Sequence, residues 1–534
     1  MKLRLWMVLG LVAAAYVGVP QAGYVWDDHA LVERNRILLH PTLTDIFARD
    51  LWCCTVGSAS GYFRPLLTVS FLLDRWTFGT GSAGPHLHSV LWHLLVVTLV
   101  AYALRDRVGD LRANVAALLF GLHPVSSEAI VWISARNDLM AAAGVIGCLV
   151  AFDRNRLLLG GLAALAACLS KENAHLLPLV LFAWRRAWGE SVRPKEWVAL
   201  GLALALAIAL RANAEIGGMS LDEGDIGVTP RTVLNGAVHF VSLLVAPWPL
   251  TSTLSVYVPP PSIPRVLAAL GSIALLVSLV VIGRARAAWL LLVGAVVLAP
   301  AALGVRWYGT FGERYYYLPL LGVCTAAVAS VPAWRGWTVV TGLLTVAALA
   351  ILHVRVPEWA DEETLFTAAV RRVPDGYSWN LLGVELIRQE RWAEATAALD
   401  TAIAKEPIQR RACRHVVGSA ERIPLPDDLL LSRSRLWSDE GCKGLGQFDG
   451  SLAMALASRG LWEEAQRAAN EAVRADPDRR DEIVRAAVDA RSMDLDALGA
   501  RAMAWPSGAA DLLDQVAYLT NAVQPSVAPG PTPQ

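Results

Sequence analysis

The chain has 534 residues, more than an ordinary folded unit of roughly 100–200, and 55% of them are hydrophobic. Its 47 basic and 47 acidic residues give a formal net charge of zero, which argues against a nucleic-acid partner, because such partners favour a basic surface. Long apolar runs fill residues 1–353, whereas the chain from 354 onward is charged and helix-friendly. These features predict a transmembrane domain (1–353), a water-soluble repeat domain (354–522) and a disordered tail (523–534) rich in Pro, Gly and Ser.

The first apolar stretch, at about 4–20, follows Lys2 and Arg4. Under the positive-inside rule these cations place the N-terminus in the cytoplasm. A cleaved signal peptide is the alternative, but Pro20 spoils the cleavage site that would end at Ala22. We therefore expect an uncleaved first helix.

Further apolar segments follow at about 87–104, 112–130, 138–152, 157–169, 174–184, 195–210, 265–283, 287–303, 315–331 and 337–353. The fold class predicted is all-α, a polytopic bundle of about eleven transmembrane helices. Residues 233–247 are interpreted as a re-entrant or surface helix, because counting them as a span would invert the segments after them. With this count Arg284, Arg286 and Arg335 fall on the cytoplasmic side, and the repeats lie on the opposite side.

The soluble region contains an internal repeat. A tetratricopeptide-like spacing joins Trp379, Leu382, Gly383, Ala395, Ala402 and Pro407, and it returns about 70 positions later at Leu452, Ala453, Ala465, Ala472 and Pro477. We expect a C-terminal α-solenoid. Cys413 and Cys442 lie in the degenerate stretch between the copies, where they could form a disulfide or stay as two free thiols. No cysteine spacing in the sequence indicates a metal site.

Charges at membrane depth are costly, so each is a candidate for function. Asp27-Asp28 follows the first helix, and two adjacent carboxylates suit a general base, although a solvated turn is the plainer interpretation. His86 and His93 share a helix face and could bind phosphate or a divalent ion, or they could be interfacial histidines with satisfied hydrogen bonds.

The stretch from His123 to Asp138 is the richest in polar groups. Glu128, Trp132 and Arg136 recur at four-residue intervals, which predicts one helical face. An arginine in a partly dry site suits a phosphate. Helix capping and a Glu128–Arg136 ion pair are the structural alternative.

Two more groups lie on the same predicted side. Lys171-Glu172 is the tip between two short apolar segments, which often end in a cavity, although an ordinary outer loop is the alternative. Glu313-Arg314 precedes three tyrosines at a helix start, where an interfacial aromatic belt would explain only the tyrosines. All these groups face one side of the membrane.

Taken together, these residues resemble the transmembrane and tetratricopeptide-repeat O-mannosyltransferases of the GT-C class. The resemblance rests on Trp26-Asp27-Asp28, Phe63-Arg64-Pro65-Leu66, His123 to Asp138, Ser170-Lys171-Glu172 and Glu313 to Pro319. Two positions depart from the family pattern, because Ser89 stands in place of an asparagine and Phe63 in place of a tyrosine.

The resemblance implies a GT-C-like enzyme that moves a sugar, expected to be mannose, from a polyprenyl-phosphate donor to protein Ser or Thr hydroxyls by one inverting displacement. Asp27 or Asp28 would take the acceptor proton. The departing phosphate would be held by Arg64, His86, His93, Arg136, Lys171 and Arg314, with Glu128, Asp138, Glu172 and Glu313 in support. The repeats would hold the acceptor protein. No metal ligands are assigned, and a divalent metal is left open as a cofactor.

Two other functions remain as alternatives: a non-catalytic membrane scaffold that uses its repeats, and a transporter for a lipid-linked sugar. The expected location is the inner membrane of a bacterium or the endoplasmic reticulum of a eukaryote, with the repeats periplasmic or lumenal. The sugar, the acceptor, the carrier length and the oligomeric state are not fixed by the sequence.

Overall fold

A computed structural model describes residues 3–53, 61–216, 230–252, 254–255, 260–308, 310–331 and 336–405, together with 456, 464, 467 and 468. The chain divides into two compact units. The first comprises residues 1–223 and 228–373, and the second comprises 224–227 and 374–534. The first unit thus includes residues 354–373, which the sequence assigned to the repeat domain.

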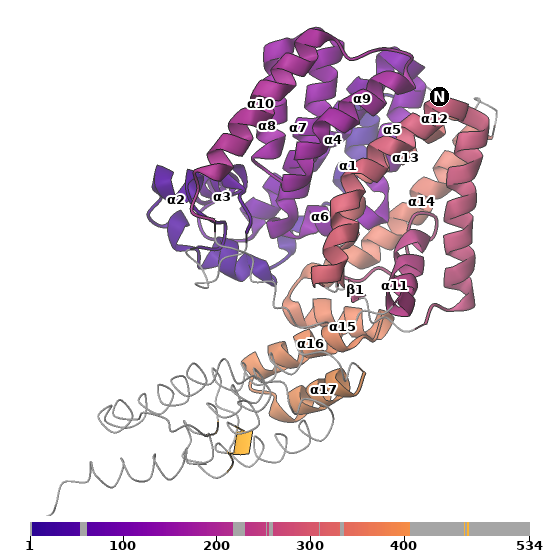
Figure 1. The fold of residues 1–534 in the computed structure, drawn as a ribbon. Helices are drawn as coiled ribbons and strands as arrows, with labels where there is room; N and C mark the ends of the chain where they lie inside the picture. Colours follow the sequence, from indigo (N-terminus) through magenta and orange to yellow (C-terminus); the bar gives the residue numbers. More distant parts are fainter. Residues whose placement is uncertain are drawn as a thin grey trace, which may run out of the picture. The chain divides into compact units, whose positions relative to one another are not determined.

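The first unit is a helical bundle (Figure 1). Its helices are α1 (Leu5–Ala15), α2 (Leu43–Phe47), α3 (Pro65–Phe78), α4 (Ala83–Val108), α5 (Asp110–Leu122), α6 (Ser127–Val131), α7 (Arg136–Asp153), α8 (Leu157–Cys168), α9 (Leu177–Ala187), α10 (Pro194–Ala212), α11 (Pro230–Ser242), α12 (Ile263–Tyr308), α13 (Pro319–Ser330), α14 (Trp337–Arg355) and α15 (Glu362–Arg372). Short helical turns include η5 (Ile133–Ala135), η6 (Glu172–Leu176), η7 (Glu313–Tyr316) and η8 (Val356–Trp359). Strands β1 (Leu254–Ser255) and β2 (Thr310–Phe311) pair antiparallel, with Leu254 opposite Phe311.

Among the residues that the structure describes, four helical stretches are long and apolar enough to cross a membrane: Ala83–Val108, Ile133–Asp153, Ile263–Ala299 and Trp337–Trp359. Asp110–Leu122 and Pro124–Val131 form a pair bent by 55° that would make a fifth, and α8 and α13 are shorter apolar helices. The chain is therefore an integral membrane protein. Each of the apolar segments expected to span contains helix, but the number of spans stays a prediction.

Two breaks in the helices bear on the sequence analysis. Arg284 has φ 49° and ψ −136° and divides α12 at the point between the two segments expected there. Trp132 has φ −77° and ψ 114° and separates α6 from η5 and α7. The expectation that Glu128 and Arg136 share one helical face is therefore wrong, because they lie on different helices.

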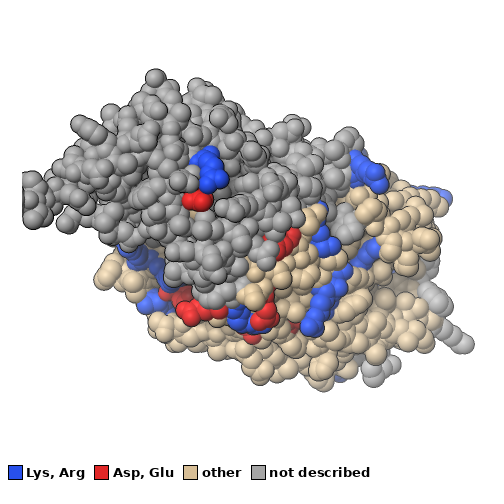
Figure 2. Space-filling view, turned by 90° about the horizontal axis from the view of Figure 1, so that it is seen from below, with Lys and Arg blue, Asp and Glu red and all other residues tan. Residues whose placement is uncertain are grey.

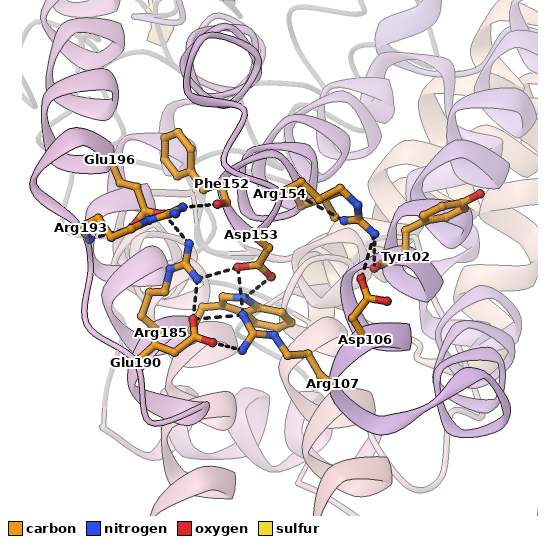
Figure 3. A network of polar contacts seen from close by, with 12 residues as sticks. Tyr102, Asp106, Arg107, Phe152, Asp153, Arg154, Arg185, Glu190, Arg193 and Glu196 are labelled. Atoms are coloured by element: carbon orange, nitrogen blue, oxygen red, sulfur yellow. Dashed lines mark hydrogen bonds and ion pairs between the residues drawn. The ribbon is translucent and has the colours of Figure 1, made fainter.

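An ion-pair network closes one end of the bundle (Figure 3). Arg107, near the end of α4, lies 3.0 Å from Asp153 and also pairs with Glu190. Arg185, in the last turn of α9, lies 2.8 Å from Asp153 and also pairs with the buried Glu196 at the start of α10. This network, called the end clamp below, joins the ends of α4, α7 and α9 to the start of α10.

The second unit is described mainly by α16 (Gly376–Arg388) and α17 (Trp392–Lys405), which pack as a hairpin. Leu382, Ala395 and Ala402 are buried, and a Cβ on Gly383 would lie 2.6 Å from the Leu399 side chain. This hairpin occupies the first repeat expected from the sequence. The second copy, Cys413, Cys442 and the tail at 523–534 lie outside the described residues, so the solenoid, the disulfide and the domain limits stay predictions.

Candidate functional site

Asp28 is held by η5, the short turn between α6 and α7. Its buried carboxylate accepts hydrogen bonds from the backbone nitrogen of Ser134 at 2.8 Å and from the Ser134 hydroxyl at 2.5 Å. The backbone nitrogen of Val25 donates to its other oxygen at 3.4 Å. Burial raises the pKa of Asp28 to about 7, although the Ser134 hydrogen bonds lower it. Three donors therefore occupy this carboxylate and fix the loop.

Asp27 has the opposite surroundings. Its carboxylate makes no hydrogen bond or ion pair with any residue that the structure describes. Burial raises the pKa of Asp27 to about 6, while the guanidinium groups of Arg314 and Arg64 lower it. Asp27 is thus a half-buried carboxylate with unused lone pairs in the field of two cations.

The backbone has an unusual conformation at Trp26, directly before Asp27. Trp26 has φ 56°, a conformation that non-glycine residues seldom adopt and that other contacts must hold in place. Its indole stacks on Trp132 at 5.1 Å between ring centroids, and its backbone nitrogen donates to Glu362 at 2.8 Å. On Trp132, the Arg314 guanidinium carbon lies 4.8 Å from the ring centroid. One aromatic stack therefore connects the Asp27 loop with Arg314.

Three cation–carboxylate pairs lie around this loop, in the group called the Asp27 cluster below. Arg64, which precedes α3, lies 2.7 Å from Glu172, and Lys171 lies 2.5 Å from Asp138 in the first turn of α7. Arg314 in η7 pairs with the buried Glu128 of α6. The structure thus brings together seven of the predicted site residues from five separate chain segments.

The cations of the cluster keep donors to spare. Arg64 uses Nε and Nη2 on Glu172, and none of the described residues accepts from its Nη1. Lys171 spends one of its three N–H groups on Asp138. Burial lowers the pKa of Lys171, and the neighbouring Arg64 and Arg314 lower it further, while Asp138 raises it. The unused N–H groups of Arg64 and Lys171 could donate to a bound anion.

Tyr315 joins these cations, and sequence reasoning did not assign it a role. Its ring lies 5.6 Å from Lys171 Nζ and 4.9 Å from the Arg314 guanidinium carbon. An aromatic face stabilises both cations without neutralising them. Its position directly after Arg314 was the signal that could have identified it.

Arg136 does not join the cluster. Its guanidinium is fully buried and pairs with Asp74 of α3, and it donates to Ser89 at 3.0 Å, to Ser70 at 3.2 Å and to the Pro85 carbonyl at 2.6 Å. These contacts join α3, α4 and α7. In this structure Arg136 therefore supports the helices that carry the cluster.

The two histidines also bind protein groups. His93 is buried, and its ring nitrogens lie 2.7 Å from the Tyr317 hydroxyl and 3.0 Å from the Gly121 carbonyl. His86 lies 3.1 Å from the Gly23 carbonyl, at the base of the Asp27 loop. The structure places both outside the cluster. His93 matches the alternative of satisfied hydrogen bonds, whereas the buried Nδ1 of His86 has no hydrogen-bond partner among the described residues.

Glu313 points away from its neighbour Arg314. Its buried carboxylate accepts from the Thr251 backbone nitrogen and lies 3.3 Å from Arg355, which lies 2.9 Å from Glu358. Burial raises the pKa of Glu313, while Arg355 lowers it. This second chain of charges fixes η7 to the segment after α14.

In the view from below, acidic and basic side chains of the described residues lie close to one another, with uncharged surface beside them (Figure 2). Within the described part of the chain, no group of three or more His, Cys, Asp or Glu side chains is arranged to hold a metal ion.

No family model matches the chain. It is similar to Protein O-mannosyl-transferase Tmtc2 of Drosophila melanogaster, with 31% identity over 200 residues, which are 36% of this chain and 18% of the relative. TMTC2 of Mus musculus is 33% identical over 138 residues, or 25% of this chain and 16% of the relative. The match to TMTC3 of Homo sapiens is 23% over 154 residues, or 28% and 17%.

Among solved structures, ArnT from Cupriavidus metallidurans bound to undecaprenyl phosphate aligns with 17% identity and a TM-score of 0.38, over 79% of this chain and 81% of that one. The matched segments cover only 12% to 23% of the length of the curated relatives. Over 36% of its own length, this chain is a sequence relative of the protein O-mannosyl-transferases.

Proposed function

We propose that the chain is a membrane glycosyltransferase. It moves a sugar, which we propose is mannose, from a polyprenyl-phosphate carrier to a protein Ser or Thr hydroxyl on the periplasmic or lumenal side. The observation that carries the proposal is Asp27, a carboxylate that pairs with no described residue and lies in the field of Arg314 and Arg64. The sequence similarity to protein O-mannosyl-transferases supports the same reaction class.

Asp27 is the general base in this mechanism. Its carboxylate removes the proton of the acceptor hydroxyl as the hydroxyl oxygen attacks the anomeric carbon. The bond between that carbon and the phosphate oxygen breaks, and its electron pair leaves with the lipid phosphate. One displacement of this kind inverts the anomeric configuration. A base with a pKa near 6 is ionised at neutral pH and still accepts a proton.

The spare donors of Arg64 and Lys171 bind the phosphate of the donor and stabilise the charge that grows on it. Arg314 adds its positive field at Asp27. Asp28 is a positioning residue, because its carboxylate is occupied by Ser134 and Val25.

Mass spectrometry of exported proteins tests the proposal in cells that carry the wild-type chain, Asp27→Asn, Asp28→Asn or no chain. Asp106→Asn, which changes an exposed carboxylate of the end-clamp region, is the matched control. Glycopeptides should vanish in the deletion and in Asp27→Asn, because losing a general base costs about 100-fold or more. They should persist in Asp106→Asn and be reduced in Asp28→Asn, whose amide oxygen still accepts from Ser134.

The two alternatives give different results. If the chain is a scaffold, cells with Asp27→Asn at the wild-type protein level should show the wild-type phenotype. A transporter would leave lipid-linked sugar on the cytoplasmic side in the deletion while no acceptor protein lost sugar. If no glycopeptide depends on the chain, the proposed function is wrong.

A further inference from the structure

An apolar groove of 560 Å³ lies between α8 and α10, away from the Asp27 cluster. Leu158, Leu162, Val198 and Leu202 line it, and each of these side chains is more than half exposed. The helices pack against each other and α8 packs on α7, a membrane-spanning candidate. Such exposed leucines and valines are stable where the groove opens to lipid chains.

The groove has the length of one membrane leaflet. Its lining on α10 runs from Pro194 to Leu206, which is about 18 Å at 1.5 Å per residue. Half of a hydrocarbon core of about 30 Å is about 15 Å. A single lipid chain that enters from one surface would therefore end near the far end of the groove.

One end of the groove is basic. Lys195 belongs to its lining, and Arg156 directly precedes Leu157, which also lines it. A hydrogen bond of 3.1 Å from Arg193 to Asn155 holds these two helix starts together. The Lys195 and Arg156 side chains are exposed, and neither makes an ion pair or hydrogen bond with another described side chain.

The acidic groups nearby are already occupied. Glu196 pairs with Arg185 and Arg193, and Asp153 pairs with Arg107 and Arg185. The N-terminal ends of α8 and α10 add partial positive charge at the same place. The groove is therefore apolar along its length and carries, at one end, the positive charges of Lys195 and Arg156.

We propose that this groove is a binding site for one anionic phospholipid, with an acyl chain between α8 and α10 and the headgroup phosphate at Lys195 and Arg156. The lipid comes from the leaflet at the end-clamp side of the bundle. The site is separate from the Asp27 cluster and does not depend on the proposed glycosyl transfer.

Native mass spectrometry tests this site on the full chain released from nanodiscs with equal amounts of phosphatidylglycerol and phosphatidylcholine. The wild type should retain one phosphatidylglycerol. Arg156→Gln and Lys195→Gln should each lower its retention about fivefold, because a cation near an anionic headgroup contributes at that level. Arg186→Gln is the matched control, since Arg186 is also exposed and without an ion pair among the described residues but does not line the groove.

A second pair of variants tests the apolar part. Leu162→Trp fills the groove and should displace the lipid, whereas Leu159→Trp on the same helix should not. Both leucines are 55% exposed, so neither change disturbs the core, and size-exclusion profiles should match the wild type.

Three results would overturn the proposal. Equal retention of phosphatidylcholine would mean that lipid lies in the groove only as solvent. Unchanged phosphatidylglycerol retention in Lys195→Gln and Leu162→Trp would place the bound lipid elsewhere. If added polyprenyl phosphate displaces phosphatidylglycerol from the wild type at equal concentration, the groove belongs to a carrier lipid.

Discussion

Asp27 and Asp28 are neighbours in the chain, yet their surroundings give them different chemistry. Ser134 and Val25 donate to Asp28, whereas Asp27 keeps its lone pairs. The sequence could identify the pair but could not choose between its members. The choice depends on Ser134, which lies 106 positions away and has no sequence signal of its own.

The pKa of Asp27 predicts the acid limb of the activity profile. As a general base Asp27 works only when ionised, so kcat/KM should fall below about pH 6 and reach a plateau above it. Because the Arg314 cation lowers the pKa of Asp27, Arg314→Gln should move this limb to higher pH. Sugar transfer measured over about two pH units on either side of neutrality would show the shift.

Arg36→Gln is the control for this shift, because Arg36 is exposed in the same loop region and is not among the groups that affect Asp27. A limb that stays in place in Arg314→Gln, or that moves equally in Arg36→Gln, would contradict the assignment of Asp27 as the base.

At the scale of elements, the segment after the last apolar helix completes the Asp27 loop. Glu362 of α15 accepts from the Trp26 backbone, and Phe366 packs edge-on against the Trp26 ring. The backbone nitrogen of Gly23 donates to the Ala360 carbonyl at 2.9 Å, and a Cβ on Gly23 would lie 2.7 Å from that oxygen. The strained backbone of Trp26 is thus held by a segment more than 300 positions away.

Glu362→Ala should lower the rate of sugar transfer about tenfold, because the lost hydrogen bond frees Trp26 and misplaces Asp27. Glu362→Gln should recover most of the rate, since its amide oxygen can accept from the same nitrogen. Glu363→Ala is the neighbouring control. The test is kcat at saturating donor, and equal losses in the alanine and glutamine variants would mean that the charge of Glu362 acts in another way.

Sequence periodicity located the helices well and the break at Trp132 badly. The spacing of Glu128, Trp132 and Arg136 favours one continuous helix. Tertiary contacts override it, because Glu128 pairs with Arg314, Trp132 stacks on Trp26, and Arg136 pairs with Asp74. None of these three partners lies within a helical turn of the residue it binds, so local patterning carries no trace of them.

At the scale of the whole bundle, charge is divided between two opposite ends. α7 begins at Arg136, next to the Asp27 cluster, and ends at Asp153 in the end clamp. Its 18 residues separate the two by about 27 Å. α8 starts at the clamp and leads to Lys171. The cluster and the clamp are therefore held at fixed distance by the helices between them.

Glu196 is the most buried acid of the end clamp, and its loss should destabilise the bundle. Glu196→Ala removes one carboxylate from Arg185, which keeps Asp153 and Glu190, and one from Arg193, so it should cost about 1–3 kcal/mol. Asp106→Asn breaks an exposed pair with Arg154 and should cost about 0–1 kcal/mol. Thermal unfolding in detergent compares the two, and equal Tm values would remove the clamp as a source of stability.

The sequence predicted the helical segments, because apolar length is a local property, and the side of the membrane that their polar groups face stays a prediction. It could not establish the number of spans. α8 and α9 have 12 and 11 residues, which is short of the roughly 20 that a bilayer requires. Whether such helices cross depends on the neighbours that cover their ends, and these neighbours come from elsewhere in the chain.

Opposite ends of one bundle should face opposite sides of the membrane, and the positive-inside rule assigns the end clamp to the cytoplasm. In a chain whose native cysteines are alanine, Gly81→Cys beside the start of α4 should react with a membrane-impermeant maleimide on intact cells. Ser191→Cys, which precedes α10, should react only after the membrane is opened. Both positions are exposed, so access to the reagent depends on the side alone.

The reverse labelling would place the Asp27 cluster in the cytoplasm, where it could not act on exported proteins. Labelling of both cysteines on intact cells would show that α4 and α10 do not carry the chain across. Only the expected order, with Gly81→Cys first, agrees with an acceptor that arrives from outside and a donor whose lipid chain lies in the membrane beside the same helices.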